Sequence, residues 1–220
     1  MGDQRPAPPP SERARVSRVP RRATYDRGIV EAILDAGRVA HLGTVRDGAP
    51  VVVPTLYARV GERVYVHGSS AARSLGALED GFPACLTVTL IDGLVLARSA
   101  VHHSVDYRSV VVHGTARAVL EPEEKLAALE AFTDNVVPGR WREARPPTAG
   151  ELKATAVLWL PLDEASAKVR SGPPADDEPD YELEVWAGNL PLETVVGAPQ
   201  PDPRLRPGIQ LPRSVRDLTG

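Results

Sequence analysis

Alternating apolar and polar positions in the first third of the chain predict three consecutive β-strands. The apolar positions fall in the segments Val39 to Val45, Val51 to Tyr57 and Val64 to His67, which are rich in β-branched and aromatic residues. Asp47-Gly48 and Gly61-Glu62 separate these segments, and Asp-Gly tolerates the positive φ of a tight hairpin turn. The region is therefore expected to form an antiparallel meander.

A candidate anion-binding helix start follows the third strand. Gly68-Ser69-Ser70 leads into a helical pattern from Ala71 to Leu78, and serine is a good N-cap residue. The free N–H groups of a helix start and the positive end of its dipole favour an anion at the same point. Arg73, one turn into this helix, adds a positive charge.

The middle of the chain predicts further strands and a second helix. Phe82 to Ile91 and Leu94 to Ala97 flank Asp92-Gly93, which is a second hairpin signal. A long strand is expected from Val105 to Leu120, with a small apolar face on its even positions and a polar face on its odd positions. A helical period from Glu121 to Val136 predicts a helix that ends before Pro138-Gly139.

Length and composition favour one folded domain with extensions at both ends. The chain has 220 residues, of which 42% are hydrophobic and 25% are charged, and this suffices for a substantial core. The domain is expected over residues 23–196. Residues 1–22 are rich in arginine and proline and are expected to be a disordered basic arm, and residues 197–220 a Pro-rich tail. No nucleic-acid partner is expected, because the arm lacks interleaved aromatic residues.

Cysteine and histidine usage predicts neither disulfides nor a metal centre. Cys85 is the one cysteine, so an intramolecular disulfide framework is excluded and a reducing compartment is favoured. His102 and His103 are adjacent, so on an extended segment they point to opposite faces, and no carboxylate or cysteine spacing completes a ligand set. No signal peptide or apolar span is evident, and the expected location is the cytoplasm, away from membranes.

The order of these segments resembles that of a known superfamily. The meander, then HGSSAARSLGAL from His67, FPACLTVTL from Phe82 and DYRSVVVHGTARAV from Asp106, is similar to the FMN-binding split-barrel superfamily. That superfamily includes pyridoxamine 5'-phosphate oxidase and the nitroimidazole-resistance proteins, and the likeness covers about residues 25–136 and 154–196. The resemblance implies an α+β protein with an antiparallel six-stranded split β-barrel and flanking helices. It also implies a homodimer that holds FMN at the dimer interface.

The resemblance places flavin-binding positions on the second and third strands, the helix start, the long strand and a WxG-like segment near the C-terminus. These positions are Val52, Val53, Pro54, Thr55, His67, Gly68, Ser70, Arg73, Ser74, Ser109 and Trp186. Arg73 matches a phosphate-binding arginine, and Trp186 is expected to cover the flavin held by a partner subunit. Each residue also has an ordinary structural interpretation, such as a half-buried strand, a helix-capping serine or a core tryptophan.

The substrate side departs from pyridoxamine 5'-phosphate oxidase. The two basic residues that bracket the second strand there fall at Val51 and Leu56, and the lysine after the matched arginine falls at Ser74. A phosphorylated vitamin B6 substrate is therefore not expected, because its phosphate needs a cationic clamp. The residues expected to border a substrate cavity are Tyr107, Arg108, Lys168 and Arg170.

The expected function is an FMN-dependent oxidoreductase in which hydride passes at flavin N5 to or from a small substrate that the sequence does not identify. No catalytic side chain is assigned. Two alternatives remain open. The thin positive charge at the phosphate position favours a deazaflavin-dependent reductase, and the scarcity of acid/base groups around Thr55 and Ser109 favours a non-catalytic flavin- or haem-binding protein.

Overall fold

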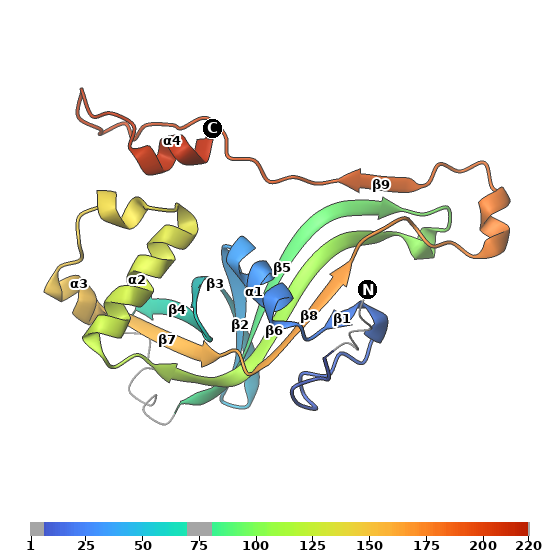
Figure 1. Ribbon diagram of the computed structural model, residues 1–220, viewed down its shortest axis with the longest axis horizontal. Coiled ribbons are helices and arrows are strands. Elements are labelled where there is room, and N and C mark those ends of the chain that lie inside the picture. Colours follow the sequence, from blue (N-terminus) through green and yellow to red (C-terminus); the bar gives the residue numbers. More distant parts are fainter. Residues whose placement is uncertain (1–6, 70–80, 220) are drawn as a thin grey trace.

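The computed structural model describes residues 7–69 and 81–219, and these form a nine-stranded sheet in the order β1-β8-β6-β7-β4-β3-β2-β5-β9. Strand β6 also pairs with β5, so β6, β7, β4, β3, β2 and β5 close into a ring. All pairings are antiparallel, and helices pack beside the ring (Figure 1). The predicted α+β split barrel is confirmed.

The strands are β1 (Ala23–Thr24), β2 (Val39–Arg46), β3 (Ala49–Val60), β4 (Arg63–Ser69), β5 (Phe82–Leu96), β6 (Ser104–Ala118), β7 (Thr155–Pro161), β8 (Glu164–Arg170) and β9 (Gly188–Pro191). The helices are α1 (Arg27–Ala36), α2 (Pro122–Val136), α3 (Ala149–Ala154) and α4 (Arg213–Thr219), with short 3-10 turns η1 (Pro20–Arg22), η2 (Ala100–His102), η3 (Arg140–Glu143) and η4 (Glu178–Glu182). Among the described residues, no helix has the length and apolar character needed to cross a membrane.

The turns of the predicted meander are confirmed. Asp47 and Gly48 join β2 to β3 with φ values of 51° and 78°, and a two-residue hairpin turn of the favoured type requires positive φ at both positions. Gly61, at φ 57°, begins the turn between β3 and β4. The Asp-Gly dipeptide therefore marks this turn because aspartate and glycine both tolerate the left-handed region.

The hairpin predicted at Asp92-Gly93 is wrong. Strand β5 runs through both residues, and its register with β6 shifts between Ile91 and Gly93, which makes Asp92 the extra residue of a β-bulge. Gly93 is needed for a close approach instead of a turn. A Cβ added there lies 3.1 Å from the Leu190 carbonyl oxygen of β9.

Helix α1 was not predicted, whereas the predicted helix at 121–136 is confirmed as α2. Asp26 caps α1 by accepting a hydrogen bond of 2.9 Å from the Ile29 N–H. The helix then buries Val30, Ile33 and Leu34 in the main barrel core. Helix α2 packs Ala128 and Phe132 into a second cluster with residues of β3, β4 and β7. The helix predicted over 71–78 lies outside the described residues.

Both chain extensions pack on the domain in part. In residues 7–22, Ala14 is buried, and Lys168 Nζ of β8 donates to the Arg18 carbonyl at 2.9 Å. In the C-terminal segment, α4 buries Ser214, whose N–H donates to the Glu143 carboxylate of η3 at 3.1 Å. Residues 192–211 between β9 and α4 are exposed and run beside the barrel (Figure 1). The domain boundaries at 23 and 196 remain a prediction.

The Tyr57 hydroxyl links the barrel to α1, because it donates to the Leu34 carbonyl in the last turn of that helix. Such terminal carbonyls have no partner within the helix, and burial raises the pKa of Tyr57, so the hydroxyl keeps its proton. We expect Tyr57→Phe to lower the free energy of unfolding by about 1 to 3 kcal/mol, since a buried carbonyl loses its donor. Urea denaturation measures this. Tyr181→Phe, at an exposed tyrosine, serves as the control and is expected to change stability by less than about 0.5 kcal/mol.

Candidate functional site

The barrel is split where β3 and β4 part. These strands pair between Tyr57–Val60 and Arg63–Val66. Before Tyr57, strand β3 pairs with β2, and after Val66, strand β4 pairs with β7. Within the part of the chain that the structure describes, residues 52–56 and 67–69 therefore each keep one strand edge without a β-partner. Unpaired backbone N–H and C=O groups along such edges are available to a ligand.

Six of the predicted cofactor residues border this split. Val52, Val53, Pro54 and Thr55 lie on the β3 side, and His67 and Gly68 lie on the β4 side. Proline has no N–H to give to a neighbouring strand, so Pro54 suits a strand edge. The Thr55 hydroxyl donates to the Leu56 carbonyl at 3.1 Å, and its remaining lone pairs are free to accept.

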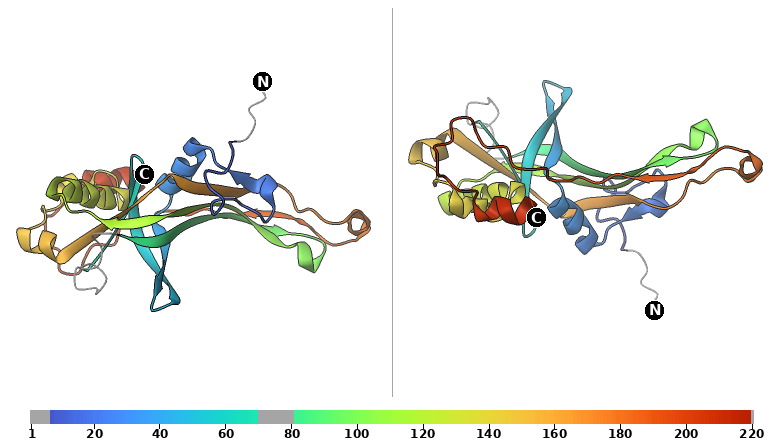
Figure 2. Two further views of the ribbon diagram at one scale, coloured as in Figure 1. Left: turned by 90° about the horizontal axis from the view of Figure 1, so that it is seen from below. Right: turned by 90° about the horizontal axis from the view of Figure 1, so that it is seen from above.

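The β2–β3 hairpin carries an apolar surface that nothing in the described chain covers. The register pairs His41 with Pro54 and Gly43 with Val52, so these residues share one face of the hairpin. Val39, Val45 and Leu56 lie on the same face by alternation, and all three are exposed. The hairpin projects from the body of the molecule (Figure 2). A contiguous apolar surface of this kind marks a binding surface for a ligand or partner.

Burial and packing against α2 favour the neutral form of His67. Its ring meets Phe132 of α2 edge-on, with centroids 4.6 Å apart and an angle of 69° between the planes. The side chain is exposed on its other side, yet desolvation lowers its pKa below the usual value. A neutral imidazole can accept a hydrogen bond or ligate a metal at its unprotonated nitrogen.

Ser109 lies apart from the split. It pairs with Thr89 of β5 and Lys168 of β8, and its hydroxyl donates to the Lys168 carbonyl at 3.3 Å. Thr87 pairs with His41, so Ser109 shares the outer face of the sheet with Pro54 but is three strands away from it, about 14 Å at about 4.8 Å per strand.

Trp186 is far from the split in its own chain. It lies two residues before β9, whose Gly188 pairs with Leu96 of β5, whereas Thr87 of β5 lies beside the β2–β3 hairpin. The nine residue-to-residue steps from Thr87 to Leu96 span about 30 Å of strand, and Figure 1 shows β9 at the end of β5 remote from β3 and β4. The indole packs over Gly188 but stays 65% exposed, so it is not a core tryptophan.

The predicted substrate cations are already engaged by the protein. Arg108 makes a bidentate pair with Asp92, at 2.7 and 2.8 Å, and this hydrogen bonding lowers the pKa of Asp92. Lys168 donates to the Arg18 carbonyl, as described above. Arg170 pairs with Asp106 and donates to the carbonyls of Gly172 and Pro173. Tyr107, between Ile91 and Arg170 in the sheet, is half-buried.

The sequence analysis missed Asp106, which joins three strands. Its carboxylate pairs with Arg170 of β8 and accepts a hydrogen bond of 2.6 Å from the Asn189 amide of β9. Asn189 also donates to the Gly172 carbonyl at 2.9 Å. This cluster fixes β9, and with it the position of Trp186. No local sequence signal links Asp106 to residues so distant in the chain.

The other predicted contacts, Ser70, Arg73 and Ser74, lie outside the described residues and remain predictions. In sequence they follow β4, which ends at Ser69.

Comparison with known proteins identifies the same kind of fold. A profile of the pyridoxamine 5'-phosphate oxidase family matches residues 26–169. The flavocytochrome Anf3 from Azotobacter vinelandii is 46% identical over 96% of this chain and 98% of its own, with a TM-score of 0.89. An FAD and haem binding protein from Mycobacterium smegmatis is 39% identical over 90% of this chain and 98% of its own, with a TM-score of 0.85.

A protein assigned to 5-nitroimidazole antibiotic resistance in Bacteroides thetaiotaomicron shares the fold, with a TM-score of 0.56 and 20% identity over 67% of this chain and 86% of its own. No curated protein matches the chain.

The Asp106 and Asp92 ion pairs make a matched test of what fixes β9. Asp106 and Arg170 are 14% and 7% exposed, whereas Asp92 and Arg108 are 37% and 42% exposed. We expect Asp106→Ala to lower the free energy of unfolding by about 3 kcal/mol or more, because Arg170 keeps a buried and unpaired charge. Asp92→Ala is expected to cost at most about 1 kcal/mol, since exposed pairs contribute little. Urea denaturation of both variants measures the difference, and equal losses would contradict this account.

Proposed function

The chain belongs to the pyridoxamine 5'-phosphate oxidase family, and within it we propose that this protein binds both a flavin and a haem and acts as a redox protein. The observation that carries this proposal is the extent of the likeness to the flavocytochrome and to the FAD and haem binding protein. Both matches cover at least 90% of this chain and so extend beyond residues 26–169.

The residues present at the split fit a flavin. Open backbone edges on β3 and β4 can exchange hydrogen bonds with the polar rim of an isoalloxazine, and the exposed Val52 and Val53 offer apolar contact to its faces. Arg73 is assigned to the phosphate, where its planar donors suit bidentate binding. The favoured flavin is FAD, because the mycobacterial relative binds it; FMN, as the family resemblance implies, is the alternative.

A haem also needs an axial ligand, for which the chain offers histidine. His41 and His67 are the histidines next to the apolar hairpin and the split, and His67 is held neutral as iron ligation requires. When bound, the flavin supplies hydride or electron transfer and the haem supplies one-electron transfer. The protein's own contribution is to hold the two groups, exclude water and set their surroundings.

The proposed reaction is oxidoreduction, for which a bound flavin would supply hydride transfer at N5, and pyridoxamine 5'-phosphate is not the proposed substrate. Val51 is half-buried and Leu56 exposed at the positions where a cationic clamp is needed, and Arg108 and Arg170 are bound to carboxylates. Neither position therefore offers a cation to a phosphate group, and both arginines are already paired. A deazaflavin remains the second flavin alternative.

We propose that the active form is a homodimer with shared sites. Trp186 lies beside the end of β5 that is remote from the split, so it does not reach the split of its own chain. It is nevertheless exposed and fixed in place by β9. A two-fold related copy would bring Trp186 of one subunit over the flavin of the other and generate two equivalent sites. The apolar face of the β2–β3 hairpin would lie in the same interface.

The visible spectrum of the purified protein tests the cofactors. We expect flavin absorption together with the intense haem band, and extraction followed by mass spectrometry is expected to yield FAD. His67→Ala and His41→Ala are expected to change the haem band if either residue ligates the iron, while His103→Ala, far from the split, is the control. A protein that binds neither added flavin nor added haem would contradict the proposal.

Removal of the tryptophan tests the shared site. Trp186→Ala is expected to weaken flavin binding by about tenfold, because a stacking surface worth roughly 1 kcal/mol or more is lost. Fluorescence titration with flavin measures this, and Trp141→Ala in η3 is the control for loss of a tryptophan. Light scattering is expected to report a dimer for the unmodified protein and for both variants. A flavin-saturated monomer would refute the shared site.

A further inference from the structure

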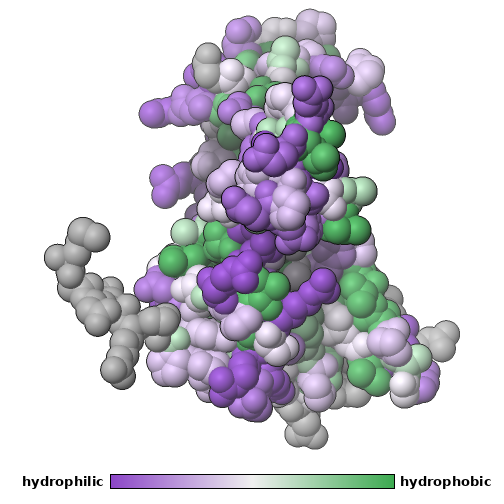
Figure 3. Space-filling view, turned by 90° about the vertical axis from the view of Figure 1, so that its right-hand side faces the viewer, coloured by the Kyte–Doolittle hydropathy of each residue, from purple (hydrophilic) through white to green (hydrophobic). Residues whose placement is uncertain are grey.

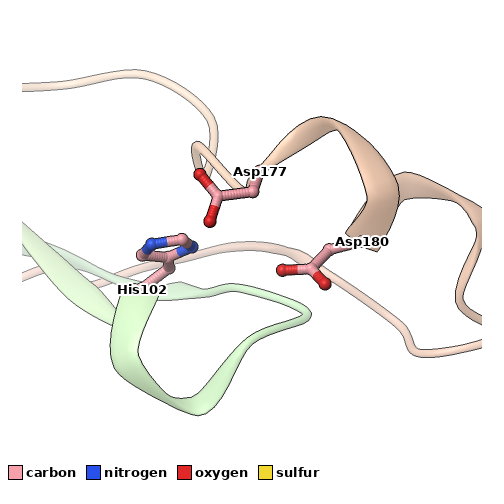
Figure 4. A group of neighbouring side chains, drawn as sticks. All are labelled: His102, Asp177 and Asp180. Atoms are coloured by element: carbon pink, nitrogen blue, oxygen red, sulfur yellow. The ribbon is translucent and has the colours of Figure 1, made fainter.

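The connection between β5 and β6 lies against residues 176–182, at the end of the molecule remote from the split. His102 of η2 and the carboxylates of Asp177 and Asp180 converge there, each with one ligand atom within 4.8 Å of the others. Figure 4 shows both carboxylates directed toward the imidazole. We propose that His102, Asp177 and Asp180 form a binding site for a divalent metal ion.

The charge distribution at this point favours a cation. Within the described residues, neither the Asp177 nor the Asp180 carboxylate takes part in an ion pair. Two such carboxylates repel each other at close range, and a bound cation relieves that repulsion. A third carboxylate, that of Asp176, lies 3.7 Å from His102 Nδ1. Hydrophilic residues dominate the middle of this end of the molecule (Figure 3).

The imidazole supplies a second and independent indication. His102 Nδ1 is buried and has no hydrogen-bond partner among the described residues. A buried polar atom without a partner carries a desolvation penalty, and such atoms in native proteins call for an explanation. Coordination of an ion would use the unprotonated nitrogen of the ring and fix its orientation. His103, the neighbour, lies outside the set and contacts the Ser99 carbonyl instead, at 3.1 Å.

The two segments are held together independently of any ion. The Asp176 carboxylate is fully buried and accepts hydrogen bonds from the N–H groups of Arg98 and Ser99, at 3.0 and 3.1 Å. The Arg98 guanidinium donates to the same carboxylate at 3.2 Å and lies over the Tyr181 ring, 4.8 Å from its centre. These contacts fix the chain on both sides of Asp177 and Asp180, so the three ligands are preorganised.

The ligand chemistry selects the ion. One imidazole nitrogen and two carboxylate oxygens suit Zn²⁺, which commonly takes three protein ligands and leaves a further position for water. Ca²⁺ and Mg²⁺ prefer sets made of oxygen alone, and Ca²⁺ takes six to eight ligands. The bound ion would clamp the β5–β6 connection to the segment that leads to Trp186. The proposal does not depend on the flavin or the haem.

Calorimetric titration of the full-length, cofactor-containing and tag-free protein with Zn²⁺, after dialysis against a chelator, tests this site. We expect one Zn²⁺ per chain and a raised melting temperature. His102→Ala and Asp177→Asn are each expected to weaken Zn²⁺ binding by at least about 100-fold, more than the 10- to 100-fold typical of changes beyond the ligands themselves. His103→Ala and Glu178→Gln are the matched controls and are expected to bind as the unmodified protein does.

Circular dichroism of each variant establishes that it is folded. Parallel titrations with Mg²⁺ and Ca²⁺ are expected to show binding at least about 100-fold weaker, because imidazole favours Zn²⁺. Absence of Zn²⁺ binding by the unmodified protein, or equal affinity in His102→Ala and His103→Ala, would overturn the proposal. Loss of flavin or haem without a change in Zn²⁺ affinity would bear only on the proposed function.

Discussion

Strand β6 pairs with three neighbours along its 15 residues, and closure of the barrel depends on this pairing. One edge follows β5 almost throughout. The other edge pairs with β8 from Tyr107 to His113 and then with β7 at Arg117 and Ala118. Between these, Gly114 leaves room for Pro161 at the end of β7, since a Cβ there would lie 3.2 Å from the proline ring. Because β7 also pairs with β4, this exchange of partners completes the ring, and the opening that remains is the split between β3 and β4.

Much of the fold could be predicted because its signals are local. The strand alternation, the Asp47-Gly48 turn and the period of α2 are each contained within a few residues. The same dipeptide gave the wrong prediction at Asp92-Gly93, where a long strand bulges so that Arg108 can pair with Asp92 and β9 can approach Gly93. A dipeptide reports which backbone angles are tolerated, and only the neighbouring strands decide whether the chain turns or bulges there.

In the candidate site, too, the positions that depend on local sequence differ from those that depend on distant strand pairing. Residues 52–55 and 67–68, which were predicted to contact a flavin, lie on the two sides of one opening because they are close in sequence and joined by a hairpin. The positions of Ser109 and Trp186 follow from register across several strands, which no local pattern contains. The contacts between Arg170 and Asp106 and between His102 and Asp177 were likewise not predicted, because they form only after distant segments pack together.

A strand edge kept open for a ligand is also open to other polypeptides. Exposed edges with apolar side chains add strands from neighbouring molecules and so promote aggregation. Strand β3 carries Pro50 near its start and Pro54 in its exposed part. Proline has no backbone N–H, so a foreign strand would find no hydrogen-bond donor at these two positions. Proline at these positions lets the barrel stay open while discouraging the self-association that an unprotected valine-rich edge would invite.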